Sequence, residues 1–508
     1  MRLQRVLLKQ QQQRVSVKRL RVESAPRWRS EQSVSSVRGF IGCVRAVWGV
    51  YRVYMLVSVC GRAGVVNMVP VCGAAVFRRC VLKNVRVVSC RTYSQEASLY
   101  IHWPYCLKRC SYCNFNKYIP RSVNHTLMTE SLQKETQTLL HVSQVSRITS
   151  VFFGGGTPSL AHPSTIAAVL DTVSKHAQLS ADAEVTLEVN PTPAGKSKLR
   201  DFVAAGVNRF SIGMQSLNDA SLRVLGRDHS SQEALHTLSE AMTLCPGRVS
   251  VDLMFGLPDQ SVDSWRCELE KVLSVCDDHV SLYQLTLERG THLFKQVQLG
   301  EVNVPGDDVT AVMYQSARSI LEKEGFLQYE VSNFAKNNAV STHNTGYWKA
   351  LQYIGVGPGA HGRFVPHALG GVLREARTQT LEPDVWIREV QQHGHATRRR
   401  IQLSHLELLE EVLVMGLRMN EGISHQHWAE FSPEASFHQV LGSSEDFQDL
   451  QKRGLLILDD RGLRCSWSGL ALLDSILPVL LLRLEKFFQK PSDSAETTDQ
   501  ADVGLKKT

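Results

Sequence analysis

The chain has 508 residues, enough for two or three domains and a large buried core. Its 43% hydrophobic and 21% charged residues are typical of a globular protein and exclude a largely disordered or membrane-embedded chain. The net charge of +8 combines two unlike parts: residues 1–96 carry 18 Lys and Arg against 3 Asp and Glu, whereas the remainder carries 39 against 46. The body of the chain is therefore acidic, which does not indicate a nucleic-acid partner.

Residues 1–95 are expected to be a mitochondrial transit segment. They are rich in Arg, Ser and Val and poor in acidic residues, as such segments are. A disordered basic tail and a wrong start codon remain alternatives, because the sequence from Met68 would itself serve as a targeting peptide. The apolar runs are too short or too often interrupted by charge to cross a bilayer. We therefore expect a mitochondrial protein without a membrane span, with membrane association left open.

From residue 98 to 324 the pattern alternates six times between strand and helix. Short β-rich runs separated by amphipathic helices favour a parallel α/β sheet, and six such units give a barrel or a partial barrel. The expected strands are 98–103, 148–153, 183–189, 209–214, 248–254 and 279–287, and the expected helices are 125–141, 163–176, 195–205, 232–244, 262–275 and 307–324.

Three of these strands have one apolar and one polar face. The apolar faces are expected to receive the helices, so Glu188, Gln215 and Asp252 would point into the barrel. Burying such groups without partners is costly, which indicates a polar ligand inside the barrel. An internal network of hydrogen bonds among these side chains is the alternative.

Three cysteines follow the first strand, at positions 106, 110 and 113, and Phe115 stands where a fourth could be. Three thiolates at this spacing can bind three irons of a 4Fe–4S cluster and leave one iron open to another ligand. A zinc ion would need a fourth protein ligand, which no nearby residue supplies convincingly. The spacing favours iron–sulfur over zinc or chance.

The chain is expected to divide into a segment at 1–95, a barrel at 96–330 and a Gly-rich connecting region at 331–400 that contains "HNTGYW". A smaller helical, winged-helix-like domain at 401–485 and a disordered tail at 486–508 would follow. Within that domain, "RGLLILDDRGLRCSWSG" indicates a hairpin followed by a helix.

The cysteine spacing, with Tyr112 before the last cysteine, resembles the signature of the radical S-adenosylmethionine (SAM) superfamily, whose usual fold is a partial (β/α)6 barrel. The stretches "FFGGGTPS", "LEVNP", "LGRDH", "VDLMFGLP" and "HNTGYW" resemble the oxygen-independent coproporphyrinogen III oxidases and, more closely, their HemW heme-chaperone branch. The resemblance extends from about residue 98 to 480. It implies a cluster on Cys106, Cys110 and Cys113, and SAM bound at the open iron. The residues that it assigns to SAM are Tyr100, Tyr112, Gly155, Gly156, Thr157, Glu188, Gln215, Arg227 and Asp252.

Two features separate the branches of this family. The oxidases have a further cysteine where this chain has Phe115, and the heme-chaperone branch has the motif His-Asn-x-x-Tyr-Trp. The resemblance therefore implies that His343, Tyr347 and Trp348 contact heme. A structural role, in which His343 and its neighbour cap a turn while Trp348 fills core, is the alternative.

The resemblance favours a heme chaperone that binds heme, SAM and the cluster and delivers heme to an unidentified acceptor protein. The alternative is a radical SAM enzyme that decarboxylates a coproporphyrinogen or acts on another substrate, with an electron donor as a further partner. Coproporphyrinogen oxidase activity is not expected, because of Phe115 and the heme motif.

The charge of the N-terminal segment yields a prediction. Residues 1–95 fused to a fluorescent reporter should direct it into mitochondria, whereas a chain that begins at Ala97 should stay in the cytosol. Microscopy and fractionation measure both. Mitochondrial import of the chain that begins at Ala97 would contradict the prediction.

Overall fold

The structure is a computed structural model that describes residues 95–489. The expected transit segment, up to residue 94, and the tail from residue 490 lie outside the described residues.

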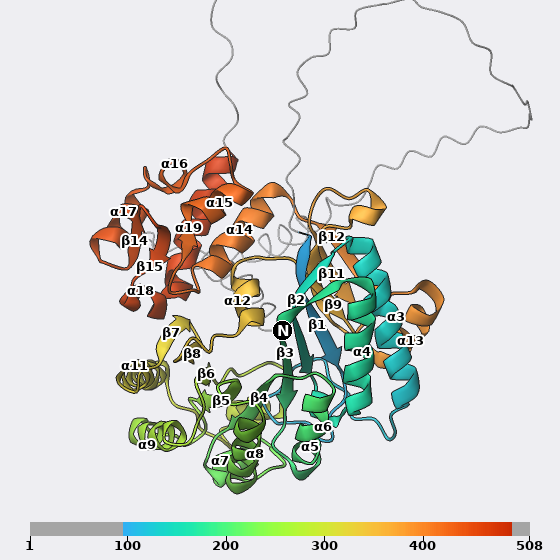
Figure 1. The fold of residues 1–508 in the computed structure, drawn as a ribbon. Helices are drawn as coiled ribbons and strands as arrows, with labels where there is room; N and C mark the ends of the chain where they lie inside the picture. The colour runs from blue at the N-terminus through green and yellow to red at the C-terminus, as the bar shows by residue number, and fades with distance from the viewer. Residues whose placement is uncertain (1–94, 490–508) are drawn as a thin grey trace, which may run out of the picture. The chain divides into compact units, whose positions relative to one another are not determined.

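Six parallel strands form the centre of a twelve-stranded sheet (Figure 1). Each pairs with the next in parallel register, as the sequence predicted for a partial (β/α)6 barrel. The strands are β1 (Glu96–Trp103), β2 (Arg147–Gly155), β3 (Gln178–Val189), β4 (Arg209–Gln215), β5 (Val249–Phe255) and β6 (His279–Gln284). The helices between and after them are α3 (His125–Ser143), η1 (Pro158–Leu160), α4 (Pro163–His176), α5 (Pro193–Lys196), α6 (Leu199–Ala204), α7 (Asp219–Val224), α8 (Ser231–Leu244), α9 (Val262–Leu273), α10 (His292–Gln298) and α11 (Asp307–Lys323).

Residues 327–402 extend this sheet at both edges. At one edge β9 lies parallel to β1, and β10, β11 and β12 continue the sheet in antiparallel pairs; at the other edge β8 and β7 follow β6. These elements are β7 (Leu327–Glu330), β8 (Asn333–Ala335), α12 (Thr342–Trp348), β9 (Tyr353–Val356), β10 (His361–Phe364), η2 (His367–Leu369), β11 (Glu375–Gln379), α13 (Pro383–His393) and β12 (Thr397–Gln402). The Gly-rich region 331–400, which was expected to connect the barrel to the C-terminal domain, thus belongs largely to the sheet of the barrel.

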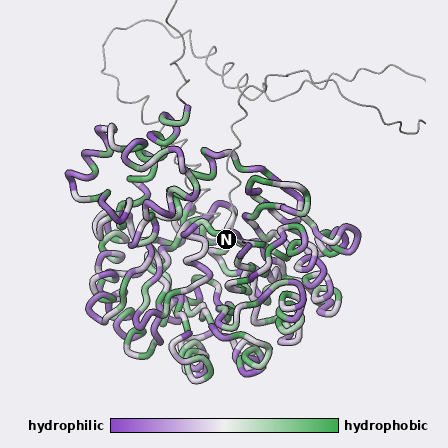
Figure 2. The backbone as a smooth tube through the Cα atoms, turned by 45° about the horizontal axis from the view of Figure 1, so that its top comes forward, coloured by the Kyte–Doolittle hydropathy of each residue, from purple (hydrophilic) through white to green (hydrophobic). Residues whose placement is uncertain are grey.

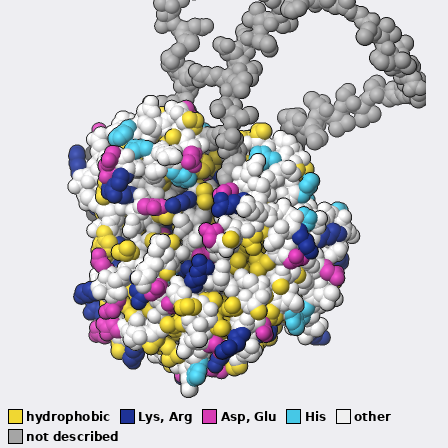
Figure 3. Space-filling model, in the orientation of Figure 1, with side chains coloured by type: hydrophobic (Ala, Val, Ile, Leu, Met, Phe, Trp, Pro, Cys, Tyr) yellow, Lys and Arg dark blue, Asp and Glu magenta, His cyan; other side chains and the backbone are white. Residues whose placement is uncertain are grey.

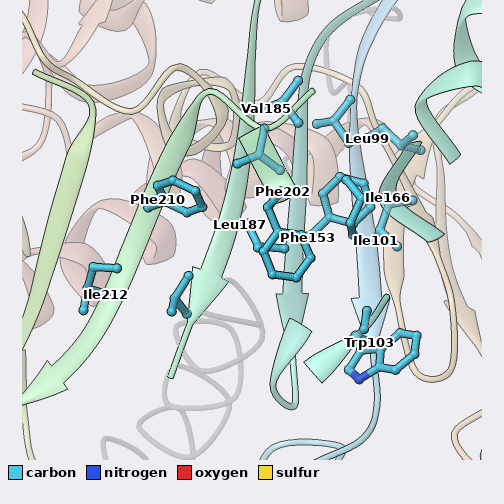
Figure 4. Close-up of a cluster of buried hydrophobic side chains, with 14 of the residues drawn as sticks. Leu99, Ile101, Trp103, Phe153, Ile166, Val185, Leu187, Phe202, Phe210 and Ile212 are labelled. Atoms are coloured by element: carbon cyan, nitrogen blue, oxygen red, sulfur yellow. The ribbon is translucent and has the colours of Figure 1, made fainter. Parts of the chain in front are cut away.

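The apolar faces of the strands pack against the helices, as predicted. Figure 4 shows side chains of β1 to β4 gathered with Ile166 of α4 and Phe202 of α6. Leu187, Phe210 and Ile212 have no exposed surface. Burial of apolar surface stabilises by roughly 25 cal/mol per Å², so this layer fixes the orientation of the strands and turns their polar faces into the barrel. Along the helices, hydrophobic and hydrophilic residues alternate, as expected when one face meets the sheet (Figure 2).

The C-terminal region has a core of its own, which includes Trp428, Phe437 and Leu480. The hairpin predicted within residues 453–469 is present as β14 and β15, and α18 follows it. The elements are α14 (His405–Gly416), β13 (Ile423–Ser424), α15 (His425–Phe431), α16 (Phe437–Leu441), α17 (Glu445–Lys452), β14 (Leu456–Asp459), β15 (Gly462–Cys465), α18 (Trp467–Ala471) and α19 (Leu473–Phe488).

Two buried arginines join this region to the barrel. Arg318 of α11 donates to the Trp467 carbonyl oxygen at 2.6 Å and stacks on the Trp467 ring at 3.6 Å. Arg418 forms an ion pair of 3.2 Å with Glu330, whose side chain has no exposed surface. Because Glu330 and Arg418 are both buried, removing either would leave an uncompensated charge, so this pair fastens the C-terminal region to the sheet.

Among the described residues, no helix combines the length and the apolar composition that a membrane span requires. On the face shown in Figure 3, basic and acidic side chains are interspersed.

A buried carboxylate ties α3 to the edge of the sheet. Glu135 is fully buried and accepts hydrogen bonds from the backbone N–H of Gly357 (2.8 Å) and Ala396 (2.8 Å) and from Trp386 Nε1 (2.9 Å). Burial raises the pKa of Glu135 to about 7, although all three donors favour the carboxylate.

Replacing this carboxylate should destabilise the chain. Glu135→Gln sets an amide N–H₂ against at least one of the three donors, and losing a hydrogen bond to a charged group costs about 1.5–3 kcal/mol. Urea denaturation measures the free energy of unfolding. The matched control is Glu130→Gln, at an exposed position of the same helix, which should change little. Equal unfolding midpoints for the two variants would contradict the prediction.

Candidate functional site

The three cysteines lie on a loop that leaves β1 and returns beside it. The Cys106 N–H donates to the Tyr118 carbonyl oxygen (2.9 Å), and the Tyr118 N–H donates to that of Pro104 (2.8 Å), which closes the base of the loop. At its far side, Ser111 donates from its N–H to Leu225 O (2.9 Å) and from Oγ to Val224 O (2.7 Å). The cluster loop, residues 106–117, is therefore fixed by backbone contacts, and its thiols are free of disulfides.

Two neighbouring side chains donate hydrogen bonds to the sulfurs. Thr157 Oγ1 lies 3.3 Å from Cys106 Sγ, and Arg227 Nη1 lies 3.5 Å from Cys110 Sγ. Burial raises the pKa of Cys106 to about 11, while the Thr157 hydroxyl and the Lys117 ammonium act in the opposite direction. Donors of this kind match sulfur atoms that carry negative charge, as thiolates on iron do.

The donor set fits a cluster better than a single ion. Among residues 95–489, no three His, Cys, Asp or Glu side chains converge closely enough to hold one metal ion, which disfavours the zinc interpretation. In a 4Fe–4S cluster each thiolate binds a different iron, so the sulfurs need not converge on one point. Three thiols on one anchored loop satisfy that geometry.

The glycines at the end of β2 are required by the close approach of the chain at the end of β1. Gly155 has φ +117°, and a Cβ there would lie 2.7 Å from the His102 ring. A Cβ on Gly156 would lie 2.8 Å from the Tyr105 carbonyl oxygen. One steric reason for these glycines is the close approach of the end of β2 to residues 102–105, which lead into the cluster loop. Their contact with SAM stays a prediction.

The polar strand faces meet just beyond these glycines. Glu188 Oε2 accepts from the Gly155 N–H at 3.1 Å. Arg227 Nη2 donates to the Gly213 carbonyl oxygen (3.0 Å), and both Arg227 and Gln215 border the space above Gly213. Gln215 has φ +67°, next to an irregularity in the β4–β5 pairing. The structure thus brings Glu188, Gln215 and Arg227 to the cluster side of the barrel.

Asp252 belongs to a hydrogen-bonded group deeper in the barrel. Its Oδ2 accepts from Ser211 Oγ at 2.8 Å and its Oδ1 from Ser250 Oγ at 3.4 Å, and Ser250 Oγ also bonds His279 Nδ1 at 2.8 Å. The internal hydrogen-bond network that the sequence offered as the alternative is therefore present around Asp252.

Of the buried side-chain polar atoms that have no hydrogen-bond partner among residues 95–489, two lie in this region. They are Nε of Arg227 and Oγ1 of Thr186, which lies on the same face of β3 as Glu188. Unsatisfied buried donors are rare in folded proteins and are expected where a polar ligand binds. Both atoms suit the polar groups of SAM.

Aromatic rings connect this region to the "HNTGYW" segment. Tyr100 donates through its hydroxyl to His102 Nδ1 (3.2 Å), since His102 Nε2 donates to Asn116 O (2.8 Å). The Phe152 ring stacks on Tyr100 at 6.2 Å and on His343 at 5.0 Å between centroids. The Phe152 ring thus lies between Tyr100, which is assigned to SAM, and His343, which is assigned to heme.

His343 is buried at the start of α12, and both of its ring nitrogens are engaged. Nδ1 bonds Ser150 Oγ at 2.9 Å and Nε2 bonds the Tyr347 hydroxyl at 2.8 Å. Burial lowers the pKa of His343 to about 3, so the ring is neutral at physiological pH. In this conformation neither nitrogen is available to an iron.

The two aromatic residues of the motif have different neighbours. Tyr347 packs edge-on against Tyr353 of β9, with centroids 4.6 Å apart. Trp348 is buried against Met415 and Met419 of the C-terminal region. Thus α12 contacts the barrel through its first turn and the C-terminal core through its last residue.

Glu184 is the main functional contact that the sequence reasoning did not name. Its carboxylate accepts from Ser341 Oγ (3.1 Å) and from the N–H groups of Thr342 (2.9 Å) and His343 (3.0 Å), and Arg209 lies 3.6 Å away. Glu184 has the same strand parity as Glu188, so its inward direction was visible in the sequence. Its partners on α12 were not.

The sequence and the fold have known relatives. Residues 100–268 match the model of the Radical SAM superfamily, and residues 403–472 match that of the HemN C-terminal domain. The chain is 72% identical over 407 residues to the radical S-adenosyl methionine domain-containing protein 1, mitochondrial, of Danio rerio, covering 80% of this chain and 92% of that protein. It is 32% identical to the heme chaperone HemW of Bacillus subtilis (strain 168), covering 71% and 92%.

Among solved structures, the coproporphyrinogen III oxidase HemN of Escherichia coli superposes with a TM-score of 0.64 at 20% identity, over 78% of this chain and 92% of that one. This likeness confirms the predicted fold class. The name of the Danio rerio relative confirms the predicted mitochondrial location.

The buried state of His343 predicts a pH dependence of stability. A histidine whose pKa falls from 6.5 to about 3 on folding binds fewer protons in the folded state, so stability is retained above pH 6.5 and lost as the pH falls toward 3. His343→Gln removes this titration and should flatten the decline between pH 6.5 and 4. Thermal unfolding of both proteins across this range measures the difference. Parallel curves would contradict the buried, neutral ring.

Proposed function

The chain belongs to the radical SAM family that includes the mitochondrial radical S-adenosyl methionine domain-containing protein 1 and the bacterial heme chaperone HemW, and on this premise we propose that it is a heme chaperone. It holds heme together with a SAM-liganded 4Fe–4S cluster and transfers heme to an acceptor protein. Import into mitochondria would be directed by residues 1–95, which would be removed from the folded body.

The cluster is assigned to Cys106, Cys110 and Cys113, and SAM to the side of the barrel that faces them. When bound, the cluster supplies one-electron chemistry and an open iron for SAM. Thr157 and Arg227 would stabilise the thiolates through their bonds to sulfur. The SAM assignment comprises Tyr100, Tyr112, Gly155, Gly156, Thr157, Glu188, Gln215, Arg227 and Asp252.

The cation of Arg227 and the carboxylate of Glu188 suit the two ends of the SAM amino acid group. Arg227 donates a charge-assisted bond to a carboxylate, and Glu188 accepts from an ammonium or a hydroxyl. The unpartnered Arg227 Nε leaves one donor for this purpose. Tyr112, which is hydrogen-bonded to Arg227, would hold the guanidinium in place.

The position of α12 is the observation that carries the chaperone proposal. This helix is the segment that resembles the heme-chaperone branch, and it packs one phenylalanine ring away from Tyr100. Phe115 replaces the further cysteine of the oxidases, which argues against coproporphyrinogen decarboxylation. The name of the Bacillus subtilis relative supports the same choice.

In this proposal His343, Tyr347 and Trp348 contact heme, which requires a change in the hydrogen bonds of His343. Iron ligation by His343 requires a free ring nitrogen, so the bond to Ser150 or to Tyr347 must break. Because Glu184 holds the first turn of α12, heme binding would require this turn to withdraw from the barrel. Trp348 would then move with the C-terminal core against which it packs.

One preparation of the full chain tests the proposed function. After anaerobic reconstitution with iron and sulfide, the protein should bind heme, seen as a Soret band, and should not decarboxylate coproporphyrinogen III with SAM and dithionite. His343→Ala should reduce or shift the Soret band while iron content is kept. Decarboxylation by the wild type would overturn the chaperone proposal and favour the enzyme.

SAM binding can be tested apart from cluster assembly. Gln215→Ala and Asp252→Ala lie outside the cluster loop, so both should retain iron and bind SAM more weakly. Losing one hydrogen bond to a charged group costs about 1.5–3 kcal/mol, roughly tenfold or more in affinity. Equilibrium binding of radiolabelled SAM measures the change. Wild-type affinity in both variants would mean that the polar faces serve only the internal network.

A further inference from the structure

Lys117 is a buried lysine inside the cluster loop. Only 7% of the residue is exposed, whereas Lys108 in the same loop is exposed. Its Nζ donates to the Cys113 carbonyl oxygen at 2.6 Å. Lysine is almost never buried without a charged partner, so this position needs an explanation.

No carboxylate provides that partner. Within residues 95–489, the Lys117 ammonium forms no ion pair with Asp or Glu, and residues 97–129 contain no acidic residue at all. A single carbonyl oxygen offsets only part of the cost of burying an ammonium. The remaining source of negative charge in this loop is the set of three cysteine sulfurs.

The path of the loop brings the ammonium back toward those sulfurs. Lys117 lies four positions after Cys113, and its side chain folds back onto the Cys113 backbone. The ammonium is therefore held within the cluster loop by a bond to the backbone of one of the three cysteines.

We propose that Lys117 is the buried counter-charge of the 4Fe–4S cluster, which raises the reduction potential of the cluster and helps the loop retain it. The inference rests on the cluster assigned in the proposed function. When an electron donor reduces the cluster by one electron, the cluster gains one negative charge and no bond to Lys117 forms or breaks. A fixed positive charge nearby stabilises that reduced state, and burial limits the screening by water.

The alternative is that Lys117 only fastens the loop through its hydrogen bond. Three substitutions separate the two roles. Lys117→Arg keeps the charge, Lys117→Gln keeps a donor without charge, and Lys117→Met removes both. Lys108→Gln is the matched control, because it removes the same charge from an exposed position of the same loop.

The full chain and its variants are reconstituted anaerobically, and iron, sulfide and visible absorption are measured first. Redox titration with dithionite, followed by electron paramagnetic resonance (EPR) without SAM or heme, then gives the reduction potential. The potentials of Lys117→Gln and Lys117→Met should be more negative than that of the wild type, and those of Lys117→Arg and Lys108→Gln should match it. Loss of iron from the two neutral variants alone would support the same role.

Several results would overturn the inference while leaving the cluster assignment intact. These are a wild-type potential in Lys117→Gln, an equal shift in Lys108→Gln, or equal loss of iron from Lys117→Arg and Lys117→Gln. By contrast, a wild-type chain that assembles no cluster on its three cysteines would overturn the proposed cofactor itself. The wild-type iron content therefore distinguishes the two failures.

Discussion

The ends of β1 and β2 approach so closely that no side chain fits between the segments that follow them. A Cβ at Gly155 or Gly156 would lie under 3 Å from residues 102–105, which lead into the cluster loop, and one at Gly226 would lie 3.1 Å from the Ser111 nitrogen in the loop. Backbone hydrogen bonds anchor the loop at Pro104, Leu225 and Tyr118. In the anchored loop, Cys106 lies beside Thr157 and Cys110 lies beside Arg227. The cluster assignment depends on these backbone contacts.

A few contacts inside the barrel connect the cluster loop to the C-terminal region. Glu188 and Arg227 stand near the loop, and Phe152 stacks on both Tyr100 and His343. Glu184 then binds the first turn of α12, and Trp348 at its end packs against Met415. In a chaperone this arrangement would let one short helix respond both to the contents of the barrel and to the C-terminal core.

Much of this organisation was predictable because it is written in local patterns. The βα alternation gave all six parallel strands to within a few residues at most ends, and strand parity gave the inward direction of Glu188, Gln215 and Asp252. Contacts between distant segments were not predictable: Glu184 and His343 are 159 residues apart and neither has a local signal for the other. The strands β9 to β12 are short and lie among glycines and turns, so their pairing depends on the preformed edge of β1. Lys117 looks like an ordinary surface lysine in the sequence, and only the fold of the loop buries it.

The central claim is that three cysteines hold a cluster whose open iron binds SAM. EPR spectra of the reduced full chain, recorded without and with one equivalent of SAM, test it most directly. Coordination of SAM changes the ligand field of one iron, so the account predicts a shift in g values that saturates at one SAM per cluster. Identical spectra in the two samples, at full iron content, would contradict it.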